Sequence, residues 1–238
     1  MSAGTVIEGL DREVNDFLKR TRFFHHELTV GRARMFVLQH RQNSRFRNSV
    51  LKLRVATNTP DWDIRLRIIH ACSQEIIADD EFGHGRSHWQ IMEDLGVAIG
   101  LDREAIQAAP LLPSTELSWH AWEGLMSNCH WLEGLIANTC AERINVPGYG
   151  AGRVREVGWS GAEGERWREL FGLSDQQLEF FTIHGEADIE HSDLGWNTVA
   201  EKSTELAMED AVVEACRTNL VVWENYFNGI GDGGDKLN

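Results

Sequence analysis

Apolar and polar positions along the chain repeat with the period of an α-helix. Apolar side chains recur every three or four residues through most of the sequence, and no segment shows the alternation typical of a half-buried strand. The four prolines lie between these periodic segments, where they are expected to end helices. The pattern predicts helices near residues 8–20, 30–42, 44–57, 61–96, 102–109, 115–144, 163–171, 175–200 and 204–228.

Capping signals and glycines suggest where these helices begin and end. Asp61 follows a proline and suits a helix N-cap, and Ser174 with Gln177 forms a capping-box pattern. The glycine-rich stretch 145–162 is typical of a long surface connection, and residues 228–238 are typical of a disordered tail. Because helices on both sides of the glycine-rich stretch carry candidate chemistry, we expect one all-α domain over residues 1–238.

Composition and charge narrow the classes of function. The net charge of −14 argues against a nucleic-acid partner, and no apolar run reaches the ~18 residues that span a bilayer. The amino terminus lacks the pattern of a secretory signal, and the four dispersed cysteines suit a cytoplasmic protein. The basic stretch 28–74 indicates either a solvated arginine-rich face or contact of Arg47, Arg54 or Arg65 with an anionic substrate group.

The segment FFTIHGEADIEHSDLGW carries the most specific chemical pattern. His184, Asp188 and His191 stand at i, i+4 and i+7, so they share one helical face over about 10 Å of axis. One metal would use two of these side chains, and all three suit two neighbouring metals. Imidazole plus carboxylate is the ligand set of non-heme iron and manganese. An amphipathic helix with a polar outer face would produce the same spacing.

A second segment, IIHACSQEIIADDEFGHGRSHWQIMEDLG, places histidines after an acid. Glu81 is followed by His84 at i+3 and His88 at i+7, again on one face of the predicted helix. Gly83 and Gly85 flank His84, which is unusual in a helix interior. The glycines indicate either close packing against a neighbouring helix or a loosened turn beside a metal or substrate.

The third segment, HWLEGLIANTCAERINVP, offers carboxylates near the end of a helix. Its candidates are Glu123, Glu133 and Glu142, and periodicity alone makes Glu142 a surface residue. Three residues on the same helical stripe as Glu142 are candidates for lining a substrate pocket: Trp131, Leu135 and Asn138.

Together these motifs resemble those of the heme-oxygenase-like diiron oxidases and oxygenases. That family has Glu-x6-His, a glutamate closing a middle helix, and His-x3-Asp-x2-His, and it shares its helical bundle with pyrroloquinoline quinone synthase and thiaminase-like proteins. The similarity covers roughly residues 30–228. It implies about seven core helices, two Fe(II) per chain and O2 as co-substrate. It implies Glu81, His88 and His184 as ligands of one iron, and Glu142, Asp188 and His191 as ligands of the other. His84 stays open as an alternate ligand or as a neighbour of one.

The resemblance also implies a class of reaction. We expect oxidation of a small nitrogen-containing metabolite with O2 and favour N-oxygenation of an amine; oxidative C–C cleavage of an amino or fatty acid is the alternative. The fold does not choose between these reactions. The expected partners are a small-molecule substrate and, optionally, an external electron donor, without nucleic acid or membrane. A homodimer stays open.

Three other interpretations compete with this one. A ferritin-like diiron protein needs a lone glutamate before the first acid–histidine pair, and residues 28–74 contain none. A heme-binding relative could use His25 or His26 as an axial ligand, but that leaves the histidine–aspartate triplet unexplained. A cofactor-free oxidase, or an interaction protein built on the same bundle, would bind no stoichiometric metal.

Overall fold

The computed structural model describes residues 2–80 and 83–237, with the backbone alone for residues 186, 187, 189–191 and 194. The described residues form helices and one isolated bridge between Asp79 and Arg86, so the predicted all-α class is confirmed. The elements are α1 (Ala3–Arg20), η1 (Arg22–Phe24), α2 (Val30–Phe46), η2 (Arg47–Leu51), α3 (Lys52–Asn58), α4 (Trp62–Ile76), α5 (His88–Ala98), α6 (Arg103–Gln107), α7 (Pro113–Ser127), α8 (Trp131–Thr139), η3 (Glu142–Asn145), α9 (Gly152–Phe171), η4 (Gln176–Leu178), α10 (Glu179–Leu206) and α11 (Glu209–Gly234).

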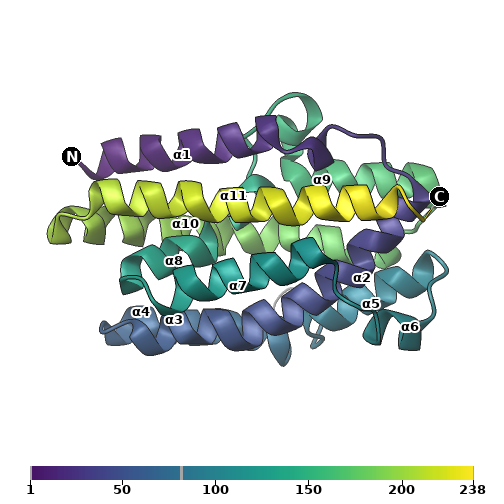
Figure 1. Cartoon of the computed structure of the whole chain (residues 1–238), viewed down its shortest axis with the longest axis horizontal. Helices are drawn as coiled ribbons and strands as arrows, with labels where there is room; N and C mark the ends of the chain where they lie inside the picture. Colours follow the sequence, from purple (N-terminus) through teal and green to yellow (C-terminus); the bar gives the residue numbers. More distant parts are fainter. Residues whose placement is uncertain (1, 81–82, 238) are drawn as a thin grey trace.

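The long helices run mostly along the long axis of the molecule and pack side by side (Figure 1). α11 is central and contacts α1, α2, α7 and α8, while α10 packs against α8 and α9. The core between them is aliphatic and aromatic, and Trp122, Trp167 and Trp196 are among its largest buried side chains. Among the helices that the structure describes, none is long and apolar enough to cross a membrane.

Both predicted capping signals are confirmed. The Asp61 carboxylate accepts from Ile64 N at 3.0 Å at the start of α4. The Gln177 side chain accepts from Ser174 N at 3.0 Å just before η4. These side chains satisfy backbone N–H groups that have no partner inside a helix, which is why such residues mark helix starts.

α2, η2 and α3 form one nearly continuous helix where the sequence pattern predicts a break near residue 43. η2 is a π-helical turn, in which Lys52 N donates to Arg47 O. A π turn adds one residue to the helical repeat and often lies at a functional site. Here Arg47, Asn48 and Lys52 are all buried, so this turn carries polar side chains into the bundle.

The prediction of a single helix over 61–96 is wrong. The structure has two helices there, α4 and α5, and the described residues between them are not helical. The connection between them turns back on itself, and Asp79 N donates to Arg86 O at 3.1 Å. His84 (φ 50°) and Gly85 (φ 75°) adopt left-handed backbone conformations that a helix interior does not contain. Helical spacing therefore does not place the residues of the second segment on one face.

Other helix boundaries also differ from the prediction. The helix expected over 115–144 is divided into α7, α8 and η3, with His130 capping α8. The surface connection expected over 145–162 is largely α9, which kinks at Gly158 (φ 76°). The local glycine content concealed this helix, because glycine disfavours helices unless tertiary packing compensates.

The disordered tail expected over 228–238 is also wrong, because α11 continues to Gly234. A Cβ atom at Gly234 would lie 2.5 Å from Arg32 Cα, so the glycine allows the end of α11 to approach the start of α2 closely. The Arg32 guanidinium pairs with Asp235 at 2.6 Å. Packing against α2 thus compensates for the low helix propensity of this segment.

Candidate metal centre

Charged and imidazole side chains from five helical elements meet in the interior of the bundle. They lie in and beside a cavity of about 80 Å³, which Glu75, Glu142, His184 and Asp188 help to line. Buried charges are rare in proteins unless they pair with one another or bind a metal. The cluster consists of Lys52 from α3, Glu75 from α4, His88 from α5, Glu142 from η3, and His184 and Asp188 from α10.

His88 stands between two carboxylates. Its Nε2 lies 2.9 Å from Asp79 Oδ2 and its Nδ1 lies 3.0 Å from Glu75 Oε2. Burial alone would lower its pKa, but Glu75 and Asp79 outweigh burial and raise the pKa of His88 to about 10. The imidazole is therefore a cation at neutral pH. Asn48 also donates to Glu75, at 2.8 Å, which fixes this carboxylate.

Lys52 is the second buried cation of the cluster. Its ammonium lies 2.8 Å from Glu142 and 3.7 Å from Glu75, and its side chain is 5% exposed. Burial opposes the charge, yet these two carboxylates raise the pKa of Lys52. Burial likewise opposes ionisation of Glu75, but His88 and Lys52 hold the pKa of that carboxyl well below its usual range.

His184 is neutral and oriented. Its Nδ1 lies 2.7 Å from the carbonyl oxygen of Phe180. A carbonyl only accepts, so Nδ1 carries the proton and Nε2 keeps its lone pair. Burial, reinforced by the positive charge of His88, lowers the pKa of His184 to about 4. The two rings are neighbours, with centroids 4.9 Å apart.

Asp188 lies on the same helix one turn after His184. Asn145 Nδ2 donates to Asp188 Oδ2 at 2.6 Å. Burial and the nearby negative charges of Glu142 and Glu75 raise the pKa of Asp188 well above its usual range. A nearby cation would stabilise the ionised form of this carboxyl group and offset these effects.

Asn145 is itself held by α9, just after the kink in that helix at Gly158. Its Oδ1 accepts from Ser160 N at 3.1 Å and from Ser160 Oγ at 2.8 Å. A Cβ atom at Gly158 would lie 2.0 Å from Asn145 O, so only glycine permits this approach. The kink in α9 therefore orients the amide that holds Asp188.

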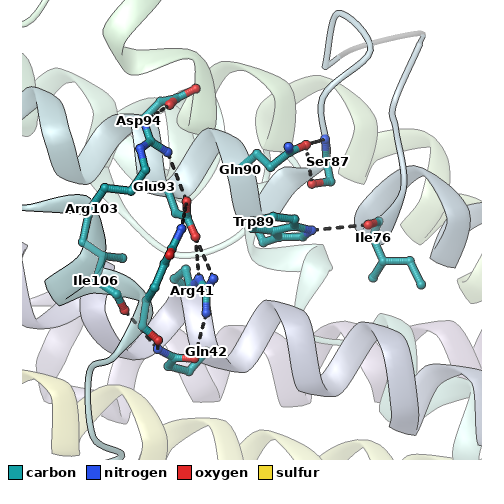
Figure 2. A network of polar contacts seen from close by, with 11 residues as sticks. Arg41, Gln42, Ile76, Ser87, Trp89, Gln90, Glu93, Asp94, Arg103 and Ile106 are labelled. Atoms are coloured by element: carbon teal, nitrogen blue, oxygen red, sulfur yellow. Dashed lines mark hydrogen bonds and ion pairs between the residues drawn. The ribbon is translucent and has the colours of Figure 1, made fainter.

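A separate polar network fixes α5, which begins at His88 (Figure 2). Arg41 on α2 donates to Glu93 at 2.8 Å, and Arg103 at the start of α6 donates to the same carboxylate at 3.0 Å. At the start of α5, Gln90 accepts from Ser87 N at 3.0 Å. These contacts hold the helix that positions the His88 ring.

The donor types present suit iron. Two imidazoles and three carboxylates share one buried site, which is the mixed ligation that non-heme iron uses. In the arrangement described, no three of the described His, Cys, Asp or Glu side chains can hold one metal ion together. Lys52 and the protonated His88 pair with the carboxylates instead.

Four predicted ligands lie in this cluster, and two fall outside what the structure describes. His88, Glu142, His184 and Asp188 are the four. Glu81 lies outside the described residues, and the side chain of His191 lies outside them as well. His84 is 80% exposed and lies 3.8 Å from Glu179, away from the cluster.

A larger cavity of about 550 Å³ adjoins the cluster, because Lys52 and Glu142 line it too. Leu135 and Asn138, two of the predicted pocket residues, are part of its lining. The third, Trp131, packs partly buried against the core and is not among the lining residues. The heme-ligand candidates His25 and His26 lie beside a different groove.

The three arginines proposed for an anionic substrate have protein partners. Arg47 donates to the backbone oxygens of Ala137 (2.9 Å) and Asn138 (3.1 Å). Arg54 pairs with Glu123, and Arg65 donates to a backbone oxygen. Arg54 and Arg65 line neither the small cavity nor the larger one.

Sequence reasoning did not identify Glu75 and Lys52, although each leaves a signal. Glu75 continues the buried stripe of α4 formed by Ile64, Ile68 and Cys72, where a carboxylate is out of place. Lys52 interrupts the apolar face between Leu51 and Val55 in the same way. A charge on an apolar stripe is a signal for a buried partner.

Comparison with known proteins assigns the family. Residues 54–224 match the family model described as iron-containing redox enzyme, so the chain belongs to this family. No curated protein matches. A solved structure from Shewanella denitrificans, described as a domain of unknown function with a heme oxygenase-like fold, is similar with a TM-score of 0.73 at 16% identity. The match covers 100% of this chain and 94% of that one.

These findings confirm the predicted heme-oxygenase-like fold and support a general oxidoreductase role that involves iron.

Proposed function

We propose that this chain is a non-heme diiron oxidoreductase that uses O2 to oxidise a small nitrogen-containing metabolite, with N-oxygenation of an amine as the favoured reaction. The observation that carries the proposal is the buried cluster of His88, His184 and three carboxylates beside a ligand-sized cavity. Membership in the iron-containing redox enzyme family supports the choice of metal.

The proposed ligands differ in protonation state and in how they are held in place. His184 offers a free lone pair on Nε2, because Nδ1 donates to Phe180 O. His88 must lose a proton first, since both ring nitrogens face carboxylates. Asp188 is kept in place by Asn145. Glu81 and His191 complete the proposed set of six, and Glu75 is an additional carboxylate within reach of His88.

Bound iron would supply the electrons that activate O2. The protein contributes a buried site, whose small cavity is also lined by the aromatic side chains of Trp159, Phe180 and Phe227. Insertion of one oxygen atom into an amine reduces the second oxygen atom to water and consumes two further electrons. An external electron donor is therefore part of the proposal.

Oxidative C–C cleavage of an amino or fatty acid is the second candidate. The larger cavity supports it, because apolar side chains such as Ile64, Ile68 and Leu135 line one part of that space. Products separate the two reactions: N-oxygenation leaves the carbon skeleton intact, whereas cleavage shortens it.

Anaerobic Fe(II) loading followed by elemental analysis tests the metal centre. We expect about two irons per chain, and about one after replacement of His184 by Ala, because an incomplete ligand set binds metal weakly. Exposure to O2 with a panel of amines, amino acids and fatty acids, followed by mass spectrometry, tests the reaction. Less than half an iron per properly loaded chain would overturn the proposal.

A further inference from the structure

His40 on α2 links the small cavity to a buried tyrosine of α11. Its side chain lines the cavity, and its Nδ1 lies 3.2 Å from the hydroxyl oxygen of Tyr226. Tyr226 is 0% exposed, and its hydroxyl has no other hydrogen-bond partner among the described residues. A buried hydroxyl with a single partner satisfies its O–H by donating, so Tyr226 donates and Nδ1 accepts.

The other nitrogen of the His40 ring therefore carries the proton. Burial lowers the pKa of His40 to about 3, so the ring is neutral at physiological pH and its one N–H is on Nε2. Nε2 has no partner among the described residues, yet it is not one of the fully enclosed polar atoms that lack one. It therefore keeps accessible surface, which for this side chain is the small cavity. One neutral ring thus joins the Tyr226 hydroxyl to the space beside the proposed ligands.

Ring contacts also connect Tyr226 with a proposed ligand. The centroids of the Tyr226 and His40 rings are 6.2 Å apart. The centroid of Phe180 is 5.7 Å from that of His40 and 4.3 Å from that of His184. An electron therefore crosses only two packed side chains between Tyr226 and His184, a path short enough for tunnelling.

The tryptophans beside the cavity lack the proton acceptor that Tyr226 has. Oxidation of an aromatic ring makes its O–H or N–H strongly acidic, so oxidation is easiest where an acceptor takes the proton. The Nε1 atoms of Trp159 and Trp223, which line the cavity, have no acceptor among the described residues. The Arg47 guanidinium also lies 5.1 Å from the centroid of the Trp223 ring, where its charge opposes a cation. Tyr226 is therefore better suited to oxidation than either tryptophan.

We infer that Tyr226 supplies one electron and one proton to the site through His40. The inference rests on the proposed function and names the source of one of the two further electrons. The O–H bond of Tyr226 breaks and its proton binds His40 Nδ1, while Nε2 releases its proton to the oxygen being reduced in the cavity. The electron passes to the oxidised metal centre. Tyr226 becomes a neutral phenoxyl radical, His40 stays neutral with its proton moved, and the external donor reduces Tyr226 again.

Electron paramagnetic resonance after O2 exposure tests the inference. Fe(II)-loaded protein is mixed with O2 without substrate and freeze-quenched over a time course. We expect an organic radical signal whose hyperfine splitting narrows when the tyrosine rings carry deuterium, and which is lost in Tyr226→Phe. Tyr149→Phe is the matched control and should keep the signal, because Tyr149, the other tyrosine of the chain, is buried and hydrogen-bonded but does not line the cavity. No radical in wild type, or a radical that survives Tyr226→Phe, would overturn the inference.

Replacement of His40 separates a relay from a structural contact. His40→Gln can still accept from the Tyr226 hydroxyl, so thermal unfolding should be close to that of wild type. A carboxamide is too weak a base to take the proton, so the radical should form about a hundredfold more slowly. An unchanged rate in folded His40→Gln contradicts the relay, and the comparison of the two tyrosine variants stands if His40→Gln does not fold.

Nitrogen NMR of histidine-labelled, metal-free protein gives a readout that does not depend on iron. The His40 signals, assigned by their loss in His40→Gln, should show a protonated Nε2 and an Nδ1 that accepts a hydrogen bond. Tyr226→Phe should shift the Nδ1 signal, because it removes the donor. A ring protonated on Nδ1 would contradict the relay.

These measurements separate failure of the inference from failure of the proposed function. A chain that consumes O2 and oxidises its iron without forming the radical would keep the proposed function and reject the inference. A chain that takes up no iron, or whose iron is inert to O2, would reject both.

Discussion

Replacement of Lys52 by Met should destabilise the metal-free protein strongly. The ammonium lies 2.8 Å from Glu142 and 3.7 Å from Glu75, and all three side chains are largely buried. Removing one partner of a buried ion pair leaves an uncompensated charge and costs about 3–5 kcal/mol of the free energy of unfolding. Methionine keeps most of the volume, so the loss reports on charge rather than on a void. Urea unfolding followed by circular dichroism under anaerobic conditions measures it.

Fe(II) should restore most of that stability. The metal brings positive charge to the same carboxylates, so the stabilisation on loading should be larger for Lys52→Met than for wild type. Lys202→Met is the matched control, because Lys202 also pairs at 2.8 Å, with Glu205, but on the surface. Exposed pairs contribute little, so this variant should unfold like wild type with and without iron. If metal-free Lys52→Met unfolds like wild type, or if Fe(II) stabilises both proteins equally, the cluster does not depend on a charge that iron can replace.

Three further measurements test the same site. His88→Ala should lower Fe(II) affinity more than His84→Ala, because His88 lies between buried carboxylates and His84 is exposed; a competition titration with the reverse order would contradict the ligand assignment. Because the folded pKa of His88 is raised to about 10 from an ordinary value near 6.5, its stabilising contribution is complete below pH 6.5 and is lost as pH rises through 10; denaturation of the metal-free protein across this range should show the fall, and His88→Gln should flatten it. Hydrogen exchange over residues 180–196 should slow when Fe(II) binds, because the metal gives buried ligands their partners; identical exchange with and without iron would rule out metal-coupled ordering.

The all-helical class, and the helix that carries His184 and Asp188, could be predicted from local sequence patterns. Apolar periodicity and the capping residues Asp61 and Ser174 are signals within a few residues of each other, so no tertiary information is needed to read them. The spacing of His184 and Asp188 on one helical face is equally local, and both side chains lie in the cluster.

The features that the sequence did not predict depend on contacts between distant segments of the chain. The connection before His88 breaks a predicted helix because His84 and Gly85 adopt left-handed conformations, which sequence periodicity does not report. The roles of Lys52 and Glu75 depend on each other across α3 and α4, so neither charge can be interpreted alone. Low helix propensity at the end of α11 is offset by packing against α2, which local rules do not include.

The close approach of Gly158 to Asn145 has a practical consequence for engineering. The connection before α9 ends at Ala151, which is exposed, and the first residue of the helix, Gly152, is exposed as well. A reporter peptide inserted after Ala151 should therefore be tolerated. A short distance along the same helix, a single added methyl group at Gly158 would push on the backbone that orients Asp188. Substitution libraries should keep both glycines, Gly152 because its φ of 56° disfavours other residues and Gly158 because a Cβ atom would collide with Asn145 O.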